Sequence, residues 1–201
     1  MSSQIHQIQQ GYSRWDQRPT KMFANGTSTL VRSGQLNVIV DTLGPWDKHV
    51  IVDRLKCFNL TPDDINYVIC THSHPDHIGN LNLFTNCKHI VGHHVYKHDI
   101  YEFDLFDKNG QIQLSNDIKV ISTPGHTMDD ISLIVNNVDK LGTVGVVGDL
   151  FECENDLQDC NIWKEAGSEN SDMQEKNRNI ILKTVDYIVP GHGSMFNVKN
   201  K

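Results

Sequence analysis

The stretch THSHPDHIGN, residues 71 to 80, places three histidines and one aspartate between His72 and His77. It follows the apolar run YVIC, residues 67–70, which predicts a short buried strand. A solvated loop has no need of so many imidazoles, whereas a neutral imidazole is a good zinc ligand. The stretch therefore predicts a metal site at the end of a strand.

Three later segments repeat this layout of an apolar run, a Gly or Pro turn and then one metal-binding residue type. They are VISTPGHT with His126, VVGDLF with Asp149 and VPGHG with His192. Strands of this kind, mixed with helices such as the one expected over residues 171–184, predict an α/β architecture that gathers polar groups at one edge. The charged run Glu175, Lys176 and Arg178 on that helix is expected to be a solvated face.

The spacing divides the candidate ligands into two groups. His72 and His74, two residues apart in extended chain, point the same way, and the first group is His72, His74 and His126. One turn onward begins the second group, which is Asp76, His77 and His192. Asp149 is expected between the two ions, because a buried anion there offsets their repulsion. Zinc suits these ligands, and iron or manganese also accept them.

Length and composition set the broader frame. A chain of 201 residues with 38% hydrophobic residues fits a single domain over 1–201, in which the stretch up to about residue 20 could form an N-terminal arm. We expect no membrane contact and a cytoplasmic or nuclear location, because no apolar leader or run of about 18 apolar residues is present. Five cysteines without a CxxC pair favour reduced thiols.

The ordered motifs carry a family resemblance over about residues 28 to 195. They are Asp41 in VIVDTLG, HSHPDH at 72–77, His126 in PGHT, Asp149 in VVGDLF and His192 in VPGHG. This series resembles the metallo-β-lactamase superfamily. The resemblance implies an αββα four-layer sandwich, two Zn²⁺ ions at the edge where the sheets meet, and metal-dependent hydrolysis. It also implies that Asp41 orients the metal ligands, and Asp76 is a candidate for transferring the proton of the attacking water.

The branch of the superfamily follows from particular residues. Asp149 stands where lactamases of the main class have a cysteine ligand, which places the chain with the glyoxalase II and nuclease-like branches. Only residues 193–201 follow His192, too few for the helical domain with which glyoxalase II holds glutathione. The connection from Asp149 to His192 is also too short for the insertion that the large RNA-processing members carry.

The stretches THSHPDHIGNLNLF, GDLFE, QEKNRNIIL and VPGHGSMF resemble a compact subfamily described as endoribonucleases that process histone pre-mRNA 3′ ends. The resemblance favours an RNA substrate, although a net charge of -7 argues against a broad phosphate-binding surface. The alternatives are a glyoxalase II-like thioesterase or other small-ester hydrolase and, from another class, a non-enzymatic metal-binding protein. A homodimer is compatible with the sequence, and His93 and His94 are either ordinary surface residues or neighbours of the site mouth.

Overall fold

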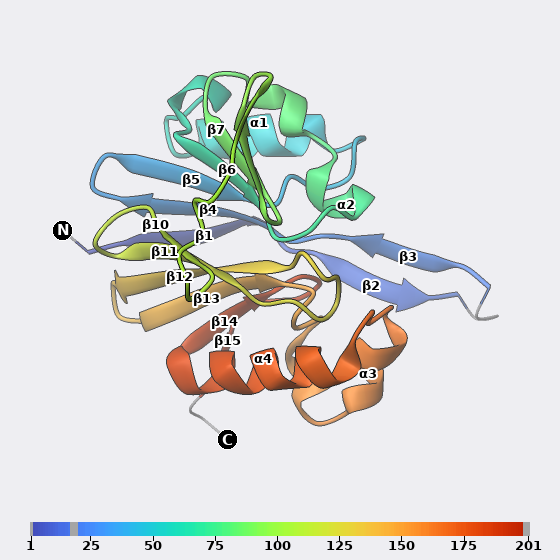
Figure 1. Cartoon of the computed structure of the whole chain (residues 1–201). Coiled ribbons are helices and arrows are strands. Elements are labelled where there is room, and N and C mark those ends of the chain that lie inside the picture. The colour runs from blue at the N-terminus through green and yellow to red at the C-terminus, as the bar shows by residue number, and fades with distance from the viewer. Residues whose placement is uncertain (1, 17–19, 199–201) are drawn as a thin grey trace.

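The computed structural model describes residues 2–16 and 20–198. Two β-sheets face each other, and helices cover their outer faces, with α1 (Lys48–Lys56) over the first sheet and α4 (Ser171–Thr184) over the second (Figure 1). These four layers confirm the predicted αββα sandwich.

The first sheet has seven strands in the order β1-β4-β5-β6-β7-β8-β9. The strands are β1 (Gln4–Gln9), β4 (Ser28–Ser33), β5 (Leu36–Val40), β6 (Tyr67–Cys70), β7 (Lys88–Val91), β8 (His94–Lys97) and β9 (Ile100–Glu102). Strands β4 and β5 are apolar, β-branched runs that form a hairpin, which turns at Gly34 with φ 60°. Residues 4–9 of the N-terminal stretch belong to this sheet, because β1 pairs with β4 as an edge strand.

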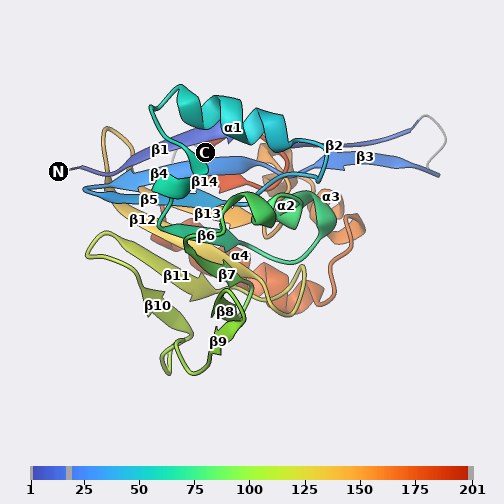
Figure 2. The same cartoon turned by 90° about the horizontal axis from the view of Figure 1, so that it is seen from above.

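The second sheet has six strands in the order β10-β11-β12-β13-β14-β15. Its strands are β10 (Gln111–Gln113), β11 (Ile118–Ser122), β12 (Ile131–Val138), β13 (Gly142–Gly148), β14 (Tyr187–Pro190) and β15 (Phe196–Asn197). A separate hairpin of β2 (Tyr12–Trp15) and β3 (Met22–Asn25) projects from the body of the molecule (Figure 2). Short helices complete the chain: η1 (Pro62–Asp64), α2 (Pro75–Ile78), η2 (Leu81–Leu83), η3 (Glu154–Leu157) and α3 (Cys160–Glu165).

Alternation along the strands builds three apolar layers, because successive side chains point to opposite faces of a sheet. Between the sheets, Val31 and Val38 of the hairpin pack in one cluster with Leu133 of β12. On the outer face of the first sheet, the neighbouring Leu30 and Ile39 pack instead with α1. Helix α4 covers the outer face of the second sheet with a third cluster that includes Ile134, Val147, Ile181, Val185 and Ile188.

Arg178 departs from the expected solvated face of α4. Its neighbours Glu175 and Lys176 are exposed, but Arg178 is buried and its Nη2 lies 2.8 Å from Asp156 Oδ1. The guanidinium carbon also lies 3.9 Å from the centre of the Phe151 ring. A charge run in the sequence does not reveal such a partner, because Asp156 comes from η3.

Two parallel strand pairs explain where polar residues collect. Strands β5 and β6 run parallel, as do β13 and β14, so each pair ends at the same edge of its sheet. Asp41 follows β5, His72 follows β6 after one residue, Asp149 follows β13, and His192 follows β14 after one residue. Among the described residues, no helix has the length and apolar character needed to cross a bilayer.

Candidate metal centre

The first group of predicted ligands is brought together by three different connections. His72 Nε2 lies 2.9 Å from His74 Nδ1, which lies 3.1 Å from His126 Nε2. Asp149 Oδ2 completes the group at 3.4 Å from His126 Nε2 and 3.6 Å from His72 Nε2. Four donors about 2.1 Å from one ion in tetrahedral geometry lie roughly 3.4 Å apart, so these spacings fit a single cation.

The second group lies on the other side of Asp149. His77 Nε2 is 3.2 Å from Asp149 Oδ1, and His192 Nε2 is 3.2 Å from Asp149 Oδ2. Asp76 Oδ2 is 3.9 Å from His77 Nε2 and 3.8 Å from His192 Nε2. Among the described residues, the buried His77 Nε2 and Asp149 Oδ1 have no hydrogen-bond partner. Burying such atoms is costly, and a bound cation would satisfy both.

The backbone of HSHPDH changes conformation between its first two histidines and its last two donors. His74 is extended, with φ -64° and ψ 147°, and Pro75 then begins the short helix α2 at the position where proline is best tolerated. The change from extended chain to helix turns His77 Nε2 towards Asp149 Oδ1, at 3.2 Å, while the ring of His77 stays next to that of His72, with ring centroids 4.2 Å apart.

Gly191 has no side chain, which leaves room for the Asp149 carboxylate between the two groups of donors. A Cβ atom at Gly191 would overlap the Asp149 carboxylate at Oδ1. The Gly191 amide also donates to Gly148 O at 2.9 Å, which joins the ends of β13 and β14. Gly191 is therefore the residue that lets the carboxylate lie between both groups.

Asp41 orients both the strand end and a histidine. Its Oδ1 accepts a hydrogen bond from Thr71 N at 2.7 Å, and its Oδ2 lies 2.8 Å from His77 Nδ1. With the proton on Nδ1, the Nε2 lone pair of His77 faces Asp149, as a metal ligand requires. Asn25 O does the same for His192, whose Nδ1 lies 3.1 Å away. The geometry agrees with the orienting role that the family resemblance implies for Asp41.

Burial and charge set the protonation of the donors. Burial and the neighbouring His77 lower the pKa of His72 well below its ordinary value, and burial also lowers the pKa of His126. Although burial acts to raise the pKa of Asp149, His77 and His192 hold it well below its ordinary value. Burial would lower the pKa of His77, but the Asp149 and Asp41 carboxylates raise it well above the ordinary value. The Asp149 carboxylate is thus anionic, and the imidazoles of His72 and His126 beside it are neutral.

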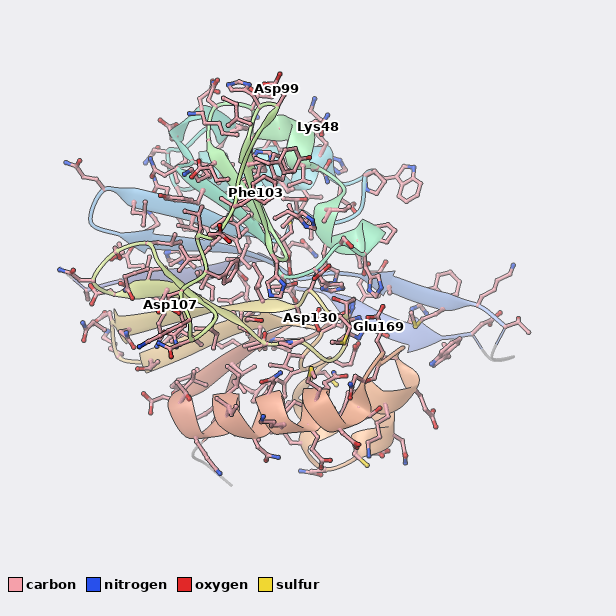
Figure 3. All side chains as sticks on the ribbon, viewed as in Figure 1. Lys48, Asp99, Phe103, Asp107, Asp130 and Glu169 are labelled. Carbon is pink, nitrogen blue, oxygen red and sulfur yellow. The ribbon has the colours of Figure 1, made fainter. Side chains whose placement is uncertain are left out.

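Two acidic residues that the sequence analysis did not select hold the turn that carries His126 (Figure 3). Asp130 accepts from Thr127 N at 2.7 Å and from Thr127 Oγ1 at 2.7 Å. Glu169 N donates to His126 O at 3.0 Å, and Glu169 Oε2 accepts from Met128 N at 2.9 Å. Burial raises the pKa of Asp130 to about 7. The Thr127–Asp130 spacing is a recognisable turn signal, whereas nothing local identifies Glu169.

His93 and His94 belong to neither group among the described residues. His93 Nε2 lies 2.8 Å from Ser122 Oγ, and its Nδ1 lies 3.3 Å from Asp129. It lines a separate hollow of about 340 Å³ with Phe103 and Phe106. The structure therefore gives these two histidines no place among the clustered donors.

A hollow of about 350 Å³ opens beside His192, between the β2–β3 hairpin and α3. Both apolar and polar side chains line it. The residues are Ser13, Arg14, Trp15, Met22, Glu152, Cys153, Asp159, Asn161, Ile162, Glu165, Ala166 and His192. A substrate that reaches the clustered donors through this hollow would contact aromatic, basic and acidic side chains.

Sequence relatives cover most of the chain. Metallo-beta-lactamase domain-containing protein 1 of Xenopus laevis is 40% identical over 96% of this chain and 81% of its own length. The human protein of the same name is 37% identical over 80% of this chain and 59% of its own length.

Solved structures share the fold at lower identity. A "probable metal-dependent hydrolase" from Staphylococcus aureus has a TM-score of 0.71 at 17% identity, covering 95% of this chain and 89% of its own. A dizinc quorum-quenching lactonase has a TM-score of 0.63 at 17% identity, covering 86% and 73%. The family description "Metallo-beta-lactamase superfamily" matches residues 23–192. With this match and a His/Asp cluster compatible with two metal ions, the chain belongs to the metallo-β-lactamase superfamily of metallo-hydrolases.

Proposed function

We propose that this protein is a dinuclear metal-dependent hydrolase, with zinc as the expected metal, and that its substrate is RNA. The main support for a dinuclear hydrolase is the position of Asp149. Its carboxylate lies 3.2 to 3.6 Å from imidazole nitrogens of both groups. Oδ2 is near His72, His126 and His192, and Oδ1 is near His77. His72, His74 and His126 would hold one ion, and Asp76, His77 and His192 the other.

Two bound cations would bring the pKa of a shared water towards about 7 and stabilise negative charge on the attacked centre. The chain supplies the geometry for this chemistry. Asp41 and Asn25 O fix the rings of His77 and His192. The side chain of Asp76 is 24% exposed, against 6% for Asp149, so Asp76 is the carboxylate better placed to pass a proton to solvent.

An endoribonuclease is supported by the resemblance to the compact RNA-processing subfamily and by the hairpin beside His192. Arg14 and Trp15 line the same hollow as His192, while Lys21 and Phe23 stand exposed on the hairpin. Basic side chains that meet phosphates and aromatic rings that stack on bases are the usual components of a single-strand site. A local surface formed by Arg14, Trp15, Lys21 and Phe23 would permit RNA binding although the net charge of the chain is -7.

The second candidate is hydrolysis of a small ester, thioester or lactone. The apolar part of the hollow favours it, because Trp15, Met22 and Ile162 offer an acyl chain a surface beside His192. The acidic residues Asp159 and Glu165 on the same rim would repel a long polyanion.

The deciding experiment measures turnover of a labelled single-stranded RNA, the matching DNA, a glutathione thioester and an acyl lactone by the metal-loaded protein. We expect RNA cleavage, with an affinity that falls steeply as salt rises through counterion release. Arg14→Ala should reduce the slope of log affinity against log salt by about 1, while Arg54→Ala on the outer helix leaves it unchanged. Turnover confined to the thioester or lactone would remove the RNA assignment and retain the hydrolase.

A further inference from the structure

Glu152 is a buried carboxylate that the function above does not use. Its exposed fraction is 4%, and its Oε1 has no hydrogen-bond partner among the described residues. Its Oε2 lies 3.9 Å from His192 Nε2. Asp149, Glu152 and His192 each offer a ligand atom within 4.8 Å of the others. Burying an unpartnered carboxylate oxygen is costly, and a bound cation would offset that cost.

The backbone holds Glu152 firmly in this position. Glu152 N donates to Asp156 Oδ2 at 2.8 Å, and His192 N donates to Glu152 O at 2.8 Å. Asp156 is itself held by the buried Arg178, so that guanidinium is already engaged beside Glu152. Hydrogen bonds through its own amide and carbonyl groups therefore fix the backbone from which the Glu152 side chain reaches His192.

We propose that Glu152 is an additional ligand of the second metal ion, which makes the two metal positions chemically unequal. This inference rests on the dinuclear centre proposed above. The first position has three imidazoles and one carboxylate oxygen. The second has two imidazoles, from His77 and His192, and carboxylates from Asp76, Asp149 and Glu152.

The chemical type of the ligands decides which metal ion each position prefers. Imidazole suits zinc, whereas carboxylate oxygen suits harder ions such as Mn²⁺, which also accept more than four ligands. Zinc binds more tightly than manganese to most donor sets, so the relevant quantity is the ratio of the two affinities. That ratio of zinc to manganese affinity is smaller at the second position than at the first, and Glu152 causes part of the difference.

The test titrates metal-free protein with Mn²⁺ and, separately, with Zn²⁺, and follows each binding event by calorimetry and bound Mn²⁺ by electron paramagnetic resonance. The variants are Glu152→Gln, which keeps the shape and removes the charge, and Glu165→Gln, which alters an exposed acid of the same hollow. Glu152→Gln should weaken Mn²⁺ at the second position by at least about tenfold and leave zinc at the first position unchanged. Glu165→Gln should match the wild type.

Mn²⁺ affinity of Glu152→Gln within about twofold of the wild type would overturn the inference, because it would make Glu152 a neutral buried acid. Circular dichroism checks the fold. If Glu152→Gln does not fold, Glu152→Asp, which keeps the charge and shortens the side chain, replaces it. Weaker Mn²⁺ binding at the second position then supports the inference, and Mn²⁺ affinity within about twofold of the wild type overturns it. A wild type that binds fewer than two ions would remove the dinuclear function itself, which distinguishes the two failures.

Discussion

At the scale of single residues, the candidate metal centre depends on the metal-binding side chains and equally on the residues that hold those side chains in place. Asp41, with φ 59°, occupies a left-handed conformation that non-glycine residues rarely adopt, and aspartate is among those that tolerate it. Its carboxylate joins Thr71, at the end of β6, to His77 on α2. One residue thus aligns two parts of the HSHPDH stretch.

Asp41→Asn tests this role. The amide offers one acceptor oxygen in place of two, so either Thr71 or His77 loses its partner. We expect the second metal affinity to fall by about 10- to 100-fold, the usual cost of losing a hydrogen-bond partner of a ligand, with the fold retained. Calorimetric metal titration measures it, and Asp53→Asn on the exposed face of α1 is the control. Unchanged affinity would assign Asp41 to the fold alone.

Gly191→Ala tests the close approach at the carboxylate. The added methyl group would overlap Asp149, so the carboxylate must leave its place between the two groups. We expect metal content to fall and hydrolysis to be lost. Gly44→Ala is the matched control, because its nearest contacts at 3.5 Å are ordinary. Full metal content in Gly191→Ala by elemental analysis would contradict this account of Asp149.

At the scale of elements, α4, η3 and the chain after β13 form one supporting unit. Arg178 Nη1 donates to Leu150 O at 2.7 Å, and Gln174 Nε2 donates to Asp149 O at 3.0 Å. The helix thereby fixes the backbone on which Asp149 sits. The boundaries of α4 match the expected range of 171–184, but its buried charge was not foreseen.

Arg178→Ala should destabilise the protein by about 3–5 kcal/mol, because it leaves the Asp156 carboxylate buried without its partner. Lys176→Ala, on the exposed face of the same helix, should change the free energy of unfolding by less than about 0.5 kcal/mol. Urea denaturation of the two variants makes the comparison. Equal stability would mean that Asp156 finds another partner.

At the scale of the whole molecule, the centre joins the two halves of the sandwich. His72, His74 and His77 come from the chain after the first sheet's β6, while His126, Asp149 and His192 follow strands of the second sheet. A bound ion therefore links segments that are distant in the sequence. Ligands that bind only the native state raise its stability.

Metal removal should consequently destabilise the fold as a whole. Free metal at 100 times its dissociation constant contributes about 2.7 kcal/mol per site, so a chelator should lower the unfolding midpoint in a way that added zinc reverses. Thermal unfolding with and without chelator measures the change. The double variant His72→Ala with His74→Ala should lose part of this response, and a midpoint indifferent to chelator would contradict the linkage.

The sequence pattern predicted those features of the structure that depend on neighbouring residues in the chain. The strand at 67–70 and the helix at 171–184 follow from periodicity and caps. The seven candidate ligands were recognisable because each lies in a connection that follows a strand, within a short motif of metal-binding residue types. Glu152, Glu169 and the buried Arg178 were not recognisable, because their partners lie on other elements and only the packed chain brings them together.

The metal content and turnover of Asp149→Asn test the central claim most directly. Asparagine keeps the shape of the side chain and removes the charge that lies between the two groups of imidazoles. Elemental analysis should find two ions in the wild type and about one in the variant, held by His72, His74 and His126, with hydrolysis strongly reduced and the circular dichroism spectrum unchanged. Two ions and near-normal turnover in Asp149→Asn would contradict the account.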